Sequence, residues 1–153
     1  MKLLTLIIIN CIALFSHGFS ALVSHVTDGD TIKIEYENKQ IIVRLAGIDT
    51  PEIKQPFGTE SKEALIDKVI NKEVVIEGEK KDRYGRLIAD IKVNDRWINR
   101  ELVEEGFAWH YKKYSKDTQL AEAELSAREL NRGLWKDENP IPPWEYRKLK
   151  KVL

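Results

Sequence analysis

The fold can be worked out from one stretch, Gln40-Ile41-Ile42-Val43-Arg44-Leu45-Ala46-Gly47-Ile48-Asp49-Thr50-Pro51-Glu52. Its first half alternates in the manner of a β-strand with one apolar face. Pro51 fixes its own φ and disfavours a helical Thr50, so the strand ends in a stiff corner. The corner carries Arg44 and the carboxylates of Asp49 and Glu52. None of these polar side chains is of a type that packs in an apolar core. A corner of this composition predicts a functional site.

Four further runs predict short strands on either side of this one. They are Leu22–Val26, Thr31–Tyr36, Glu73–Glu77 and Leu87–Val93. Each is rich in β-branched residues, and Thr31–Tyr36 alternates cleanly between apolar and polar side chains. The turn Glu37-Asn38-Lys39 is expected to join Thr31–Tyr36 and Gln40–Leu45 as a hairpin.

Three helices are expected among and after these strands. Thr59 is predicted to cap a helix that runs to Val69, Asn99 to cap Arg100–Glu105, and Asp117 or Thr118 to open a helix through Asn131. Residues 136–153 contain three prolines and are expected to form an extended strap over the domain. Five strands and three helices predict an α+β protein, built as a five-stranded Greek-key barrel of the OB type. Such barrels commonly bind oligonucleotides on one face.

The first twenty residues differ from the rest of the chain. Lys2 is followed by an apolar run from Leu3 to Phe15, and small residues follow it. This pattern is typical of a secretory signal peptide, with cleavage expected after Gly18 or Ser20. A membrane anchor is the alternative, but the run is short for a span and no basic cluster follows it.

The composition describes one soluble domain over residues 21–153. Apolar residues make up 42% of the chain and charged residues 33%. Removal of residues 1–20 takes away the only cysteine and leaves 24 basic and 25 acidic residues. A net charge near zero argues against wholesale electrostatic binding of nucleic acid, but it permits a local basic groove.

Three motifs carry the candidate chemistry. They are Asp28-Gly29-Asp30-Thr31, the Arg44 to Glu52 corner, and Asp82-Arg83-Tyr84-Gly85-Arg86. Each has a simple structural explanation taken singly, because Asp and Gly dominate turns and an exposed arginine on a strand is common. Their joint occurrence favours a site.

In their order and spacing these motifs resemble the staphylococcal nuclease (thermonuclease) family of secreted, calcium-dependent nucleases. The resemblance runs from about Leu22 to Tyr146 and includes three further pieces: Gly106-Phe107-Ala108-Trp109, Gly133-Leu134-Trp135 and Asn139-Pro140-Ile141-Pro142-Pro143-Trp144. It implies an endonuclease that cleaves DNA and RNA and leaves 3′-phosphate ends.

The residue types suit that chemistry even without the resemblance. Asp30, Asp49 and the backbone carbonyl of Thr50 are hard oxygen ligands of the kind that Ca²⁺ prefers. Glu52 could accept a proton from an attacking water. Arg44 and Arg86 are permanently charged forks that match phosphate oxygens. The resemblance implies the same roles: Arg44, Glu52 and Arg86 catalytic, and Asp30, Asp49 and Thr50 on calcium.

Aromatic and basic residues that alternate along the chain predict a groove for nucleotides. The candidates for substrate binding are Tyr84, Tyr111, Lys112 and Tyr114, because tyrosines can stack on bases and lysines pair with phosphate. A solvated loop with amphipathic tyrosines is the alternative. The loop after Trp109 departs from the pattern of the family's founding member, which leaves open which tyrosine contacts the substrate.

We therefore expect a secreted or periplasmic, monomeric nuclease that acts on DNA and RNA with Ca²⁺ and has no stable membrane association after signal cleavage. A non-catalytic OB-fold module that binds single strands is the first alternative. It is disfavoured because binding alone needs no acid beside the phosphate. A structural calcium protein is the second alternative, and two arginines at the site argue against it.

Overall fold

The computed structural model describes residues 18–152 of the 153-residue chain. Residues 1–17, which hold most of the expected signal peptide, lie outside the described residues. The strand β1 begins at Phe19, just after the first of the two expected cleavage positions.

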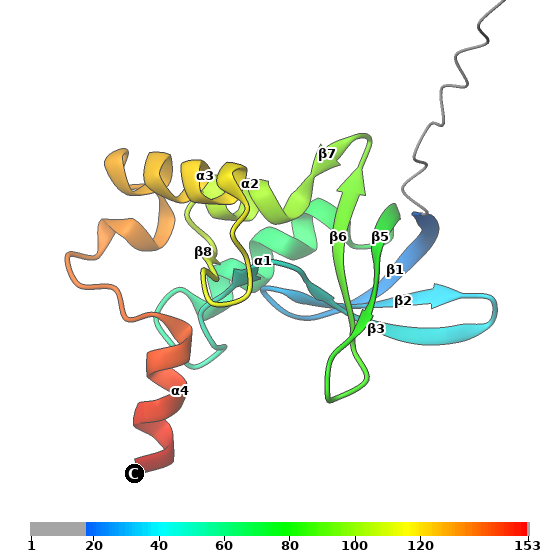
Figure 1. Cartoon of the computed structure of the whole chain (residues 1–153), viewed down its shortest axis with the longest axis horizontal. Coiled ribbons are helices and arrows are strands. Elements are labelled where there is room, and N and C mark those ends of the chain that lie inside the picture. The colour runs from blue at the N-terminus through cyan, green and yellow to red at the C-terminus, as the bar shows by residue number, and fades with distance from the viewer. Residues whose placement is uncertain (1–17, 153) are drawn as a thin grey trace, which may run out of the picture.

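Five strands form a closed, mixed β-barrel. They are β1 (Phe19–Asp28), β2 (Thr31–Tyr36), β3 (Lys39–Leu45), β5 (Glu73–Lys81) and β6 (Leu87–Val93). Their order is β3-β2-β1-β5-β6, and a parallel pairing between β3 and β6 closes the sheet on itself. The expected α+β fold with a five-stranded barrel of the OB type is confirmed (Figure 1).

The alternating sequence explains how each strand faces the core. In β6 the residues at every second position are buried, and the residues between them are half-buried. The same period of two places Ile32 and Ile34 of β2 and Val43 and Leu45 of β3 inside the barrel. One continuous cluster of buried side chains fills the barrel and extends to the helices.

Three very short strands complete the structure and were not expected from the sequence. They are β4 (Ile48–Asp49), β7 (Arg96–Trp97) and β8 (Trp109–His110). Strand β4 pairs with β8, so that Asp49 lies opposite Trp109. The corner after β3 is therefore fixed by a segment far along the chain, which sequence periodicity cannot reveal.

The three expected helices are present, close to their predicted limits. They are α1 (Gly58–Val69), α2 (Ile98–Glu104) and α3 (Thr118–Glu129), with a 3-10 turn η1 (Gly133–Lys136) after them. Asp117 caps α3, since its carboxylate accepts a hydrogen bond from the backbone N–H of Leu120 at 3.0 Å. The expected cap of α1 is wrong, because Phe57 occupies that position in a left-handed conformation.

The expected cap of α2 is also wrong, because Asn99 lies inside the helix and is fully buried. Its side chain accepts a hydrogen bond from the N–H of Ile91 at 3.0 Å and donates one to the carbonyl of Ala46 at 3.0 Å. Asn99 therefore links α2 to β6 and to the corner after β3, and a buried amide needs such partners.

The described residues contain four α-helices rather than three. The fourth, α4 (Pro143–Val152), replaces the extended strap expected over residues 136–153. Pro140 and Pro142 precede it, and Pro143 is its first residue, where a missing N–H costs nothing and a fixed φ favours the helix. Figure 1 shows α4 running away from the barrel at the end of the chain. None of the helices in the described part of the chain is both long and apolar enough to cross a membrane.

Gly58 joins the fold to the functional corner. A Cβ built at Gly58 would overlap the backbone carbonyl of Glu52. We expect Gly58→Ala to lower the free energy of unfolding by about 1–3 kcal/mol, since a crowded backbone must shift. Urea denaturation measures this loss. Thr59→Ala is the matched control and should change stability little, because Thr59 is exposed and does not cap the helix. Equal stabilities of the two variants would contradict the close approach.

Candidate active site

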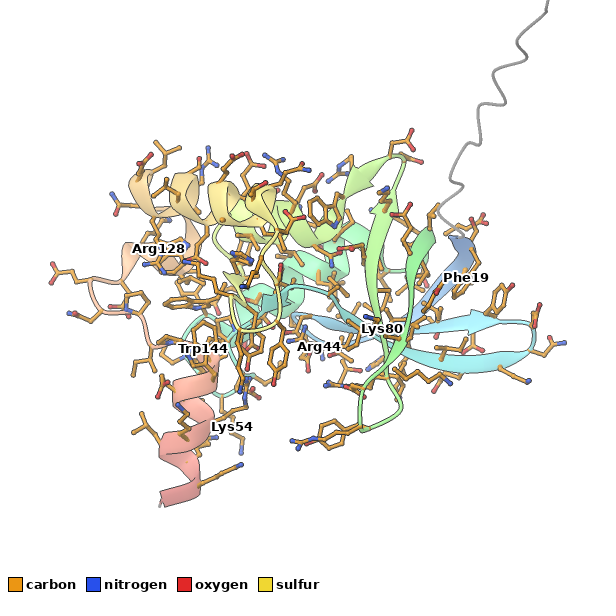
Figure 2. The ribbon with its side chains drawn as sticks, in the orientation of Figure 1. Phe19, Arg44, Lys54, Lys80, Arg128 and Trp144 are labelled. Carbon is orange, nitrogen blue, oxygen red and sulfur yellow. The ribbon has the colours of Figure 1, made fainter. Side chains whose placement is uncertain are left out.

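Arg44, in β3, is the centre of a cluster that joins the turn between β1 and β2 to β4. Its Nε lies 3.1 Å from Oδ1 of Asp30, and its Nη2 lies 3.2 Å from Oδ1 of Asp49. Its Nη1 donates to the carbonyl of Leu45 at 2.6 Å. Figure 2 shows Arg44 at the end of the barrel that faces Trp144 and helix α4. The structure thus brings Asp30 and Asp49 to the same guanidinium.

Thr50 connects the corner that carries Asp49 directly to Asp30. Its backbone N–H and its hydroxyl donate to Oδ2 of Asp30 at 2.9 and 3.0 Å. Asp30, Asp49 and Thr50 are all buried. Two buried carboxylates this close together need positive charge beside them, and arginine side chains supply it here.

Burial also perturbs the acids of this cluster. It raises the pKa of Asp49, against the opposing hydrogen bond from Arg147 and the charge of Arg44. Burial, followed by repulsion from Asp30, raises the pKa of Asp28 to about 6. Both shifts come first from burial, which disfavours a charged carboxylate away from water.

Glu52 follows the corner and is more accessible than the buried acids, with a side chain that is 43% exposed. Its backbone N–H donates to Oε1 of Gln55 at 3.1 Å, which shapes the loop before α1. Its carboxylate accepts a hydrogen bond from Nη1 of Arg147 at 2.8 Å. Glu52 is therefore the acid of the corner that water can reach, and it is paired with Arg147.

Arg86 lies in the turn between β5 and β6 and is held by its own loop. Its side-chain Nε lies 2.7 Å from Oδ2 of Asp82, and its backbone N–H donates to Oδ1 of the same residue at 3.0 Å. Slight burial acts to raise the pKa of Asp82, but these hydrogen bonds outweigh it and hold the pKa below its usual value. Arg86 lines the same cavity as Arg44, although no direct contact joins it to Asp49 or Glu52 among the described interactions.

The cluster opens into a cavity of about 1340 Å³. All four of the expected substrate-binding residues line it: Tyr84, Tyr111, Lys112 and Tyr114. Tyr84 and Tyr114 are largely exposed, whereas Tyr111 stacks on Trp144 with ring centroids 5.1 Å apart and nearly parallel planes. The geometry makes Tyr84 and Tyr114 the more accessible surfaces for a base.

One face of α4 lines the cavity and was missed in the sequence. It consists of Trp144, Arg147, Lys148 and Lys151. Their spacing of three, four and seven residues is that of a single helical face, so the signal was present once Pro143 is seen to start a helix. The three prolines of this segment had favoured an extended chain.

The donor set fits a hard cation. Within residues 18–152, no group of three or more His, Cys, Asp and Glu side chains is arranged to hold a metal ion. The carboxylates of Asp30 and Asp49 and the backbone carbonyl of Thr50 are oxygen donors, and all three residues are buried at the end of the barrel. Oxygen donors of this kind suit Ca²⁺ rather than softer metals.

His110 also lines the cavity, but its contacts are those of a packed residue. It is buried, its Nε2 lies 3.2 Å from the hydroxyl of Ser115, and its backbone N–H donates to Glu124. Burial lowers the pKa of His110, which keeps the ring neutral near pH 7.

The chain matches the family model described as staphylococcal nuclease homologue over residues 42–137. It is 43% identical over 128 residues to an uncharacterized endonuclease of Haemophilus influenzae, covering 83% of this chain and 72% of the relative. It is 37% identical over 144 residues to a micrococcal nuclease of Shigella flexneri, covering 87% of this chain and 83% of the relative.

A plant protein is similar to the chain over a smaller part of its own length. The staphylococcal-like nuclease CAN1 of Arabidopsis thaliana is 38% identical over 123 residues, which cover 77% of this chain and 38% of the relative. The chain spans about a third of the length of the plant proteins that it matches. The family model includes the corner from Arg44 to Glu52 and the turn with Arg86, and it ends before α4 begins.

Proposed function

The chain belongs to the staphylococcal nuclease family, and from this premise we propose that it is a calcium-dependent endonuclease that cleaves DNA and RNA and leaves 3′-phosphate ends. One observation carries the proposal. A buried acidic pair, two arginines and an accessible glutamate line one cavity, together with exposed tyrosines and lysines.

The reaction assigns a separate task to each group. Glu52 takes a proton from a water whose oxygen attacks phosphorus, and the bond from phosphorus to the 5′ oxygen breaks. The electron pair stays on the 5′ oxygen, which takes up a proton from solvent, so the phosphate remains on the 3′ side. Arg44 and Arg86 pair with the phosphoryl oxygens as negative charge grows on them.

Asp30, Asp49 and the carbonyl of Thr50 would hold Ca²⁺. When bound, the ion supplies positive charge beside the phosphate. Arg44 keeps the two aspartates in place through contacts of 3.1 and 3.2 Å, so that their oxygens stay together at the end of the barrel. Tyr84, Tyr111, Lys112 and Tyr114 would bind the neighbouring nucleotides.

Secretion is part of the same proposal. Residues 1–20 have the composition of a signal peptide, and the protein would act outside the cytoplasm as a monomer, with no stable membrane association after signal cleavage. Cleavage after Gly18 suits the fold best, because Phe19 is already part of β1 and its ring lies 4.4 Å from that of Tyr36. Cleavage after Ser20 would remove this contact.

Removal of calcium tests the proposal. The protein without residues 1–18 is incubated with plasmid DNA, with a single-stranded oligonucleotide and with RNA, in CaCl₂ or in excess chelator. We expect degradation in calcium only, with 3′-phosphate ends on the products. Retention of DNA without cleavage under any divalent ion would contradict the enzyme and support a binding module.

A further inference from the structure

Helix α4 brings to the site an arginine that the proposed reaction does not use. Nη2 of Arg147 donates to Oδ2 of Asp49 at 2.7 Å, and Nη1 donates to Oδ1 of Asp49 at 3.2 Å. The same Nη1 donates to Oε1 of Glu52 at 2.8 Å. One guanidinium therefore holds both the expected metal ligand and the expected general base.

Arg147 is placed there by a docked helix. The hydroxyl of Tyr146 donates to the carbonyl of Lys54 at 3.0 Å, and the amide of Gln55 donates to the carbonyl of Ile141 at 2.6 Å. Trp144 packs on Trp109, with centroids 5.6 Å apart, and stacks on Tyr111. The segment before and within α4 thus rests on the loop that follows Glu52, which makes the Arg147 contact a feature of the fold.

A cation and Arg147 need the same carboxylate. Both oxygens of Asp49 accept hydrogen bonds from Arg147, and Oδ1 also accepts one from Arg44. A divalent ion on Asp49 would repel a guanidinium at this distance and would compete with it for the carboxylate oxygens. The ion and Arg147 therefore compete for Asp49.

Of the two arginines on Asp49, Arg147 is the one that can leave. Its side chain is 40% exposed, whereas that of Arg44 is 12% exposed. Arg44 is also held by Asp30 and by the carbonyl of Leu45. Its guanidinium is permanently charged, so an Arg147 that leaves Asp49 remains a cation.

The space beside Arg147 suits an anion. Lys148 and Lys151 lie on the same helical face and line the same cavity. Lys112 and Arg86 line it from other elements. A guanidinium released from Asp49 therefore faces a basic cavity in which a phosphate group is the matching ligand.

We propose that Arg147 is a substrate-binding residue that neutralises Asp49 and Glu52 until a divalent cation binds Asp49, and then moves to a phosphate group of the nucleic acid. This inference rests on the proposed function. Cation binding then frees Glu52 as a base and supplies a phosphate ligand in the same movement.

Calcium affinity without nucleic acid is the first test. CaCl₂ is titrated by calorimetry into the wild type, Arg147→Ala, Arg147→Lys and Arg100→Ala. We expect Arg147→Ala to bind Ca²⁺ about tenfold more tightly, which corresponds to a wild type whose Asp49 is free for about a tenth of the time. Arg100 is a matched control, because its side chain is 39% exposed and it pairs with Glu104 away from the cavity. Arg100→Ala should bind as the wild type does.

Substrate affinity is the second test. At saturating Ca²⁺ we expect Arg147→Ala to raise the KM for a single-stranded oligonucleotide about tenfold, through loss of one phosphate contact, and to reduce its salt dependence. Arg147→Lys keeps the charge and should lose less of this affinity. If Arg147→Ala fails to fold by circular dichroism, Arg147→Lys carries the calcium test and should also bind more tightly than the wild type.

The outcomes separate this inference from the function on which it rests. A wild type that cleaves DNA in calcium, with Arg147 variants that bind Ca²⁺ no more tightly, would make Arg147 a brace for α4 and overturn the inference alone. A wild type that neither binds Ca²⁺ nor cleaves nucleic acid would overturn the proposed function and the inference together.

Discussion

Glu52→Gln is expected to lower turnover of DNA by at least about 10²-fold, because an amide cannot accept the proton of the attacking water. Glutamine has nearly the shape of glutamate and keeps an oxygen that can accept the hydrogen bond from Arg147. The fold and the affinity for DNA should therefore remain close to those of the wild type. Single-turnover cleavage of a labelled oligonucleotide in CaCl₂ measures the rate of the chemical step, and thermal unfolding checks the fold.

Glu63→Gln is the matched control for this variant. Glu63 is an exposed acid of α1 and does not line the cavity, so the control removes one negative charge without touching the site. It should cleave at the rate of the wild type. A Glu52→Gln enzyme as fast as this control would remove Glu52 from the mechanism.

Arg86→Ala is expected to slow cleavage by at least a comparable factor. Loss of one preorganised cation that faces growing charge costs about 3 kcal/mol in the transition state. The loop should tolerate the change, because Arg86 is bonded to Asp82 within an exposed turn and not to the core. We therefore expect kcat to fall while the urea midpoint stays within the error of the wild type.

A control from the same hairpin separates charge from position. Lys80→Ala removes one positive charge from β5 at an exposed position outside the cavity and should leave kcat unchanged. Arg86→Lys keeps the charge but loses the planar fork and should recover only part of the rate. An Arg86→Ala enzyme with the wild-type kcat would mean that Arg86 only stabilises the turn.

The barrel strands were predictable because the signal for each strand lies within its own residues. Alternation of apolar and polar residues selects one face of a strand for the core, and this holds for Thr31–Tyr36 and Leu87–Val93 without reference to any partner. The helix that starts after Asp117 was predictable for the same reason, since its cap is a local hydrogen bond. One error arose where a residue bonds across the fold. Asn99 is of a residue type that often caps helices, but here its buried side chain links α2 to Ile91 and Ala46.

The candidate site divides in the same way. The order Asp49-Thr50-Pro51-Glu52 places two acids on one stiff corner by chain connectivity alone, and the sequence by itself determined this corner, the barrel strands and the family. Only the tertiary structure decided that β3 pairs with β6, that Arg44 joins Asp30 to Asp49, and that α4 sets Arg147 on Asp49 and Glu52. The physical reason is range. Periodicity and capping act over a few residues and can be read locally, whereas ion pairs between distant segments form only when the packed core brings those segments together.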